Sequence, residues 1–212
     1  MNYLFIATGC FILLLQHILP ISSNTQWNEQ PYQVTISESS QLLIHGSTNV
    51  NRFQCKYTLP LSPEVFTVNA RQTSGTLYFS DALIKLQTAY FKSGHPQITR
   101  DMQTLLKARQ YPYIVIQLLH AELPKSMAAP DSPQILQSNV EITLAGTARR
   151  YTIPVYLSDQ GEEQILSGEL KLNVCDFNLE LPKVMFGMIT VNEEVNIIFN
   201  LKVCVDTPVT IN

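Results

Sequence analysis

The sequence predicts an all-β fold, namely an antiparallel eight-stranded, lipocalin-like β-barrel with one short amphipathic helix. Most segments alternate apolar and polar residues at period two, the pattern of a strand with one buried face. One segment alone has helical spacing. A single helix is too little to cover the apolar faces of so many strands. Such strands bury those faces either by packing two sheets together or by closing one sheet into a barrel. We predict closure, because a barrel of about eight strands encloses packed side chains or one small ligand.

The amino-terminal segment, residues 1–23, contains no Asp, Glu, Lys or Arg. It has an apolar middle and small residues at its exit, which predicts a signal peptide cleaved near Ser23. A single-span anchor is an alternative, but Gly9, Gln16 and His17 interrupt the apolar run, which is shorter than the roughly 20 residues a span needs. A lipoprotein site at Cys10 is a further alternative. The expected product is one domain, residues 24–212, in the periplasm or secreted.

The strands are expected wherever the period-two alternation is clear. The last segment is the clearest, since Val195, Ile197 and Phe199 share one face while Asn196 and Asn200 share the other. Ten segments fit a strand on this basis: 34–36, 41–45, 53–59, 66–70, 83–91, 113–120, 140–144, 151–157, 166–174 and 195–203. A proline-rich loop is expected between residues 123 and 137.

One segment, residues 99–109, is expected to be helical. Met102, Leu105 and Leu106 stand at i, i+3 and i+4, which places them on one helical face. Thr99 suits the N-cap, and Pro112 prevents continuation.

Composition and charge exclude several classes of protein. Charged residues are 15% of the chain, against about 25% in an average soluble protein, and the net charge is −3. The largest basic cluster is Arg149–Arg150, too small for a nucleic-acid partner bound by phosphate neutralisation. Nothing after residue 23 approaches 18 uninterrupted apolar residues, so no membrane span is expected in the mature chain.

Motifs for catalysis or metal binding are scarce. His45, His95 and His120 lie on separate segments, and the chain has no HExxH, GxSxG, P-loop or GxGxxG pattern. Ser74–Gly75 reads as a turn rather than a nucleophile elbow. We therefore predict no catalytic residue, no metal and no cofactor.

Three cysteines follow the signal, an odd number in a compartment where disulfides form. If a loop at 181–190 joins two antiparallel strands, Cys175 faces about Asn196, and Cys204 lies about 27 Å farther along at about 3.4 Å per residue. A bridge needs Cα atoms within about 7 Å, which excludes Cys175 to Cys204. Cys55 with Cys204, Cys55 with Cys175, and free thiols all remain open.

Four stretches, in order along the chain, resemble the YceI-like family of small exported antiparallel barrels that bind lipids or polyisoprenoids. LLIHGSTN at 42–49 is similar to the family's early strand and turn. MQTLLKA at 102–108 with YPYIVI at 111–116 is similar to its helix and YPxIxF strand, with Ile116 in place of Phe. ITLAGTARRYTIPV at 142–155 is similar to its G-x-T-[KR] hairpin, with Ala148 in place of Thr.

The fourth stretch, LKLNVCDFNL at 170–179 with the final strand at 191–201, is similar to the family's DFG strand, loop and last strand, with Asn178 in place of Gly. Together the stretches cover most of residues 33–203. Asn49 and Asn51 make the chain similar to divergent members in exported proteins of Bacteroidetes-type bacteria.

The resemblance implies a carrier or sequestering protein, not an enzyme, whose barrel accepts an isoprenoid or similar hydrocarbon chain. Inward-facing residues of the strands would contact it, and we expect these to be Phe66, Val68, Ile114, Ile116, Ile142, Leu144, Ile153, Val155, Leu170, Leu172, Ile197 and Phe199. Arg149 and Arg150 are the candidates for an anionic head group, because a guanidinium binds phosphate bidentately.

Two rival readings stay open. The same inward residues would equally make an ordinary filled core, as in a purely structural exported module. An enzyme that uses the barrel as a hydrophobic reaction chamber would need a buried polar side chain aimed at the interior, for which Gln117, Tyr78 and His120 are the candidates.

Overall fold

A computed structural model describes residues 29–61, 65–124, 133–160, 163–184 and 188–206. The expected signal peptide, residues 1–23, lies outside the described residues. Strands dominate, and their order with the helical turns is β1 Gln30–Ile36, β2 Gln41–Ser47, β3 Arg52–Tyr57, β4 Phe66–Thr73, β5 Thr76–Ser80, β6 Leu83–Gln87, η1 Thr88–Tyr90, β7 Phe91–Ser93, α2 Pro96–Leu105, β8 Tyr113–Glu122, β9 Gln134–Leu144, β10 Thr147–Gln160, β11 Glu163–Asn173, η2 Val174–Phe177, β12 Lys183–Val184, β13 Ile189–Thr190 and β14 Glu194–Asp206.

Eight antiparallel strands close into a ring of hydrogen bonds, which confirms the predicted barrel. The ring runs β1, β4, β5, β8, β9, β10, β11 and β14, and β14 returns to β1. The closing pair matches Gln33 with Asp206 and Ile36 with Val203. Because successive side chains point to opposite faces, one face of every strand is turned into the ring.

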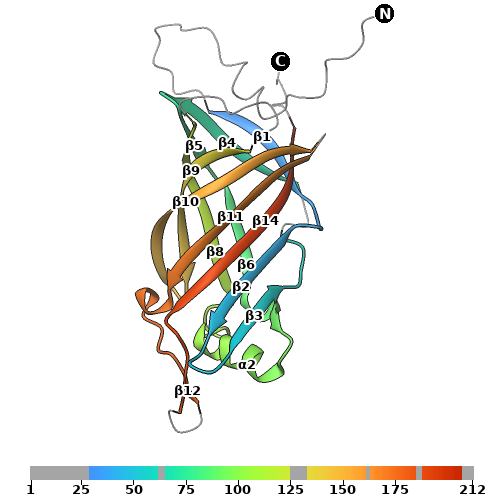
Figure 1. The fold of residues 1–212 in the computed structure, drawn as a ribbon. Coiled ribbons are helices and arrows are strands. Elements are labelled where there is room, and N and C mark those ends of the chain that lie inside the picture. The colour runs from blue at the N-terminus through green and yellow to red at the C-terminus, as the bar shows by residue number, and fades with distance from the viewer. Residues whose placement is uncertain (1–28, 62–64, 125–132, 161–162, 185–187, 207–212) are drawn as a thin grey trace, which may run out of the picture.

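The lower half of the barrel in Figure 1 is completed by other strands. There β14 pairs with β2, β2 with β3, and β3 with β7, while β6 pairs with β8. β6, which pairs with β8, is followed by η1 and then by β7, which pairs with β3. The chain itself therefore connects the β8 side of this half to the β3 side. The amide of Thr88 donates to the carbonyl of Pro112 at 2.9 Å, and the amide of Thr58 donates to that of Tyr90 at 3.1 Å.

Two tight turns shape the ring. Ser74 and Gly75 join β4 to β5, and Ala145 and Gly146 join β9 to β10. All four have positive φ, which two-residue hairpins require in order to match the twist of the strands. The sequence prediction placed a turn at Ser74–Gly75 but omitted β5, the strand that the turn leads into.

The predicted helix exists but occupies different residues. It runs from Pro96 to Leu105, with extended His95 as N-cap and Pro at the first helical turn, a position where a missing N–H costs nothing. Thr99 is not the N-cap, since it lies inside the helix and its Oγ1 accepts a hydrogen bond from the Ser93 amide at 2.9 Å. The helix ends before residue 109 because Lys107 has a φ of 50°.

The segment after β11 turns sharply through η2. The side chain of Asn173 caps η2 by accepting from the Cys175 amide at 2.8 Å, and Asn178 ends it with a φ of 56°. That left-handed conformation favours Gly and next Asn, which accounts for the Asn at position 178. Asn173 pairs with Glu194 in β14, so Asn196 lies across from Lys171 rather than from Cys175 as predicted.

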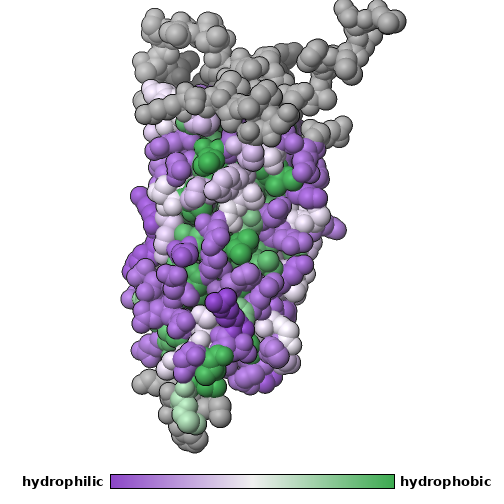
Figure 2. Space-filling view, in the orientation of Figure 1, coloured by the Kyte–Doolittle hydropathy of each residue, from purple (hydrophilic) through white to green (hydrophobic). Residues whose placement is uncertain are grey.

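One face of the molecule is mostly hydrophilic. Figure 2 shows purple residues over most of one face, with separate green spots between them. No helix within the described ranges has the length and apolar character needed to cross a membrane.

Candidate functional site: an apolar cavity inside the barrel

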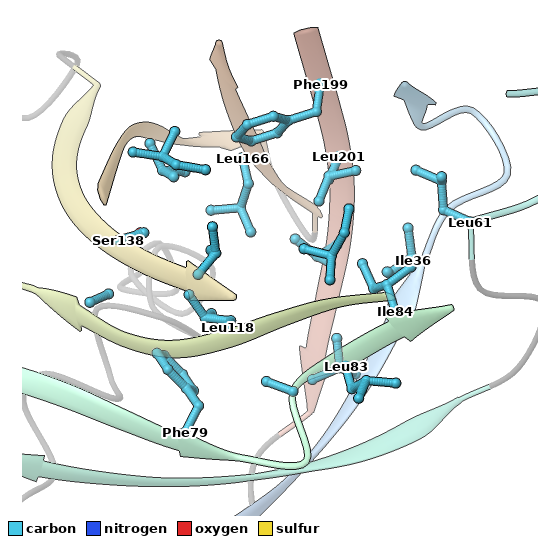
Figure 3. Close-up of a pocket in the computed structure, with 18 of the residues that line it drawn as sticks. Ile36, Leu61, Phe79, Leu83, Ile84, Leu118, Ser138, Leu166, Phe199 and Leu201 are labelled. Atoms are coloured by element: carbon cyan, nitrogen blue, oxygen red, sulfur yellow. The ribbon is translucent and has the colours of Figure 1, made fainter. Parts of the chain in front are cut away.

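A cavity of about 260 Å³ lies inside the barrel. All eight strands of the ring contribute to its wall, together with β2 and β6. Figure 3 shows the labelled side chains converging from these strands on one space. The volume is just below the range of about 300–1,000 Å³ typical of ligand pockets, so a single slender chain fits better than a bulky ring system.

The cavity does not extend through the end of the barrel near α2. Side chains fill that end: Leu86, Phe91 and Phe177 are each 1% exposed. Leu106 is also buried, and Met102 packs against the same core from α2. Proteins pack such interiors about as densely as organic crystals, so the end of the barrel with Phe177 is a solid floor under the cavity.

The structure brings most of the predicted ligand-contacting residues together. Nine of them line the cavity: Phe66, Val68, Ile116, Ile142, Ile153, Val155, Leu170, Ile197 and Phe199. The other three, Ile114, Leu144 and Leu172, are buried in the core but are not among the lining residues. They face inward as predicted, but they lie at the end of the barrel that the solid floor fills. Alternation shows which side chains face inward, and it does not show how far along the barrel axis each one lies.

Phe199 owes its position in the wall to a glycine. Gly168 lies opposite Phe199 in the β11–β14 register, and a Cβ added to Gly168 would come within 2.5 Å of the Phe199 ring. The ring therefore lies against the bare backbone of β11. A side chain at Gly168 would push the ring into the cavity or distort the pair of strands.

Two polar residues of the wall were not predicted. Ser138 and Gln164 are 4% and 6% exposed and both line the cavity. The sequence could have indicated both residues, because each occupies a position at which the alternation of its strand predicts an inward-facing side chain. Ser138 alternates in step with Val140 and Ile142, and Gln164 in step with Leu166.

The two predicted head-group arginines do not line the cavity. Both lie near the start of β10, not in the turn, and neighbouring residues of a strand point to opposite faces. Arg150 Nε donates to Glu141 Oε2 at 2.9 Å, and Arg149 donates to the carbonyl of Ala148 at 2.9 Å. The pair does not form one bidentate phosphate clamp in this arrangement.

None of the three polar candidates for a reaction chamber lines the cavity. Tyr78 and His120 are cross-strand neighbours whose rings are 5.6 Å apart, and the guanidinium of Arg71 lies 4.8 Å from the Tyr78 ring. Gln117 pairs with Glu141, a partly exposed residue that bonds to Arg150. Within the described ranges no group of three or more potential metal ligands occurs.

Cys55 and Cys175 are free thiols. Burial raises the pKa of the fully enclosed Cys55. Cys175 is exposed, yet its pKa is also raised, first by partial desolvation and then by the negative charges of Glu193 and Asp176 and a hydrogen bond to Glu193. A nucleophilic cysteine requires a lowered pKa, so neither thiol has the character of a catalytic one.

The Cys175 thiol provides a test of these charges. Replacing Glu193 with Gln removes a negative charge next to the thiol, so the pH midpoint of its alkylation by iodoacetamide is expected to fall. Peptide mapping by mass spectrometry follows Cys175 separately from the others. Glu194→Gln is the matched control, since the Glu194 carboxylate contacts Lys171 instead. An unchanged or higher midpoint in Glu193→Gln would contradict the assignment.

Comparison with known proteins identifies the fold. No protein-family model matches the sequence, and no curated protein matches it significantly. BcnA of Burkholderia cenocepacia aligns with a TM-score of 0.59 at 15% identity, over 79% of this chain and 99% of that one. A polyisoprenoid binding domain from Saccharophagus degradans, implicated in plant cell wall breakdown, aligns with a TM-score of 0.58 at 11% identity, over 82% and 98%.

A YCEI protein of Campylobacter jejuni aligns less well, with a TM-score of 0.42 at 14% identity over 87% of this chain and 86% of that one. The conclusion on the fold rests on the first two alignments, which span nearly the whole of each relative. Several structural neighbours of this chain are YceI proteins, and the chain shares the fold of BcnA and of the polyisoprenoid binding domain.

Proposed function

We propose that this chain is an exported binding protein that holds an isoprenoid or similar hydrocarbon chain inside its barrel, for carriage or sequestration. The observation that carries the proposal is the cavity of about 260 Å³ inside the barrel, with an almost wholly apolar wall. Transfer of a hydrocarbon from water into such a space is favourable by about 0.8 kcal/mol for each buried methylene. The fold shared with a polyisoprenoid binding domain supports the same class of ligand.

The proposal includes export and processing. Residues 1–23 are proposed to be removed as a signal peptide, which leaves residues 24–212 as the binding domain in the periplasm or outside the cell. The proposed contacts are the nine predicted residues that line the cavity. A barrel interior filled entirely by side chains would favour a purely structural module. Here a cavity lies between the packed end at Phe177 and the other end of the barrel.

Analysis of the protein as its own host produces it tests the function. Native mass spectrometry before and after organic extraction is expected to show one bound molecule per chain, and the extract is expected to contain one hydrocarbon-chain compound in matching amount. The purified, extracted protein is then expected to bind farnesol saturably. A protein that is empty from its host and fails to bind farnesol would reject the proposed function.

A further inference from the structure

Gln164 is a polar side chain in an apolar wall. It is 6% exposed, it lines the cavity, and its carboxamide has no hydrogen bond to another described residue. Leaving a buried amide without a hydrogen bond costs about 1–3 kcal/mol. A leucine in the same inward phase of β11 would avoid that cost, as Leu166 and Leu170 do.

The carboxamide of Gln164 is also not sealed inside packed protein. Among the described residues, the enclosed side-chain atoms without partners are His45 Nε2, Gln72 Oε1, Tyr151 Oη and Asn196 Oδ1. Gln164 is buried yet is not one of these, and it lines the cavity. A molecule inside the barrel can therefore reach its amide.

Gln164 lies near the mouth of the cavity, so it would contact the end of a bound molecule that is nearest the mouth. It is the second residue of β11, whereas Leu172 at the other end of that strand belongs to the solid floor. In the registers of its neighbours Gln164 lies opposite Val203 of β14 on one side and Asp159 of β10 on the other. Asp159 is exposed, so this row of residues marks the mouth of the cavity.

The charges around Gln164 select a neutral group. None of the described residues that line the cavity is charged, and in the β10–β11 register Gln164 faces the carboxylate of Asp159, which repels anions. Arg149 lies ten positions from Asp159 along β10, about 33 Å at about 3.3 Å per residue. A carboxamide offers two N–H donors and one carbonyl acceptor, which suits a hydroxyl or a carbonyl oxygen.

We propose that the bound chain carries an uncharged oxygen-bearing group, a hydroxyl or carbonyl, at its end nearest the mouth, and that the Gln164 carboxamide binds this group by hydrogen bonding. The inference rests on the proposed function and names the polar part of the same ligand. Ser138 does not share this role, because it lies opposite Ile153, six positions and about 20 Å from Asp159 along β10.

Competition for the cavity between three probes with one carbon skeleton tests the proposal: farnesol, the hydrocarbon farnesene and farnesyl monophosphate. Displacement of an apolar fluorescent dye gives each affinity. The wild type is expected to bind farnesol roughly 2- to 12-fold more tightly than farnesene, the net contribution of one hydrogen bond. Gln164→Leu is expected to abolish that preference while farnesene binds as before or more tightly.

The controls separate the two proposals. Gln137→Leu makes the same change on an exposed residue of β9 and is expected to keep the preference for farnesol. Gln164→Met replaces Gln164→Leu if the latter fails to fold. Retention of the preference in the Gln164 variant, its loss in Ser138→Ala instead, or tighter binding of farnesyl monophosphate than of farnesol would overturn this inference alone. Absence of binding by all three probes would reject the proposed function as well.

Discussion

Leu118→Trp is expected to lower the affinity for farnesol at least tenfold, a loss of about 1.4 kcal/mol or more, and to leave the barrel folded. Leu118 projects from β8 into the cavity (Figure 3) and is only partly buried, so the indole has space to enter. In a space of about 260 Å³ the added ring atoms occupy volume that the ligand needs. Overpacking a filled core costs about 1–3 kcal/mol, and the void reduces that cost here.

The affinity measurement is paired with thermal unfolding. Tyr156→Trp is the matched control, because Tyr156 is 44% exposed on the outer face and the variant adds an indole outside the barrel. Its affinity is expected to equal that of the wild type. Val140→Phe fills the cavity from β9 and is expected to weaken binding as well. Folded variants of Leu118 and Val140 that both bind farnesol like the wild type would show that the ligand binds elsewhere.

Phe177→Ala is expected to lower the free energy of unfolding by about 3–5 kcal/mol, the usual loss when a fully buried Phe is truncated. Phe177 is 1% exposed, and its ring stacks on Tyr151 with centroids 6.3 Å apart. η2 holds it in the solid floor, where neighbouring side chains have little room to close a new void. Urea unfolding at equilibrium measures the loss.

Two comparisons make the stability result specific. Phe177→Leu keeps most of the apolar volume and is expected to lose clearly less than Phe177→Ala. Tyr113→Ala truncates an aromatic ring that is 47% exposed, and is expected to change stability by no more than about 0.5 kcal/mol. Equal losses for Phe177→Ala and Tyr113→Ala would mean that the barrel end near α2 is not the packed core described.

The sequence predicted the barrel because alternation reports directly which face of a strand is buried. Val140, Ile142 and Leu144 all face inward as their spacing indicates. It did not separate the two that line the cavity from Leu144, which lies in the floor, because the floor is built by η2, α2 and η1 from distant parts of the sequence. β5 was missed since its consecutive residues Leu77, Tyr78 and Phe79 show no alternation of apolar with polar side chains.

The end of the helix and the role of Gln164 could not be predicted from the sequence for a different reason. Lys107 ends the helix through its backbone conformation, which side-chain periodicity does not encode. Gln164 was visible in the sequence as a polar residue out of place in an apolar phase, yet its meaning depends on the cavity beside it. The position of Cys175 was not predicted, because it lies in η2, beyond the last residue of β11 that pairs with β14.

The pairing of β1 with β14 also bears on how the chain folds. The strand that closes the ring joins residues near position 33 to residues near position 206, with almost the whole domain between them. Contacts so distant in sequence form slowly, since most of the chain must lose its conformational entropy before these contacts contribute any stability. Local hairpins such as β9–β10 are expected to form early, and the cavity comes into existence as an enclosed space only at the last step of folding.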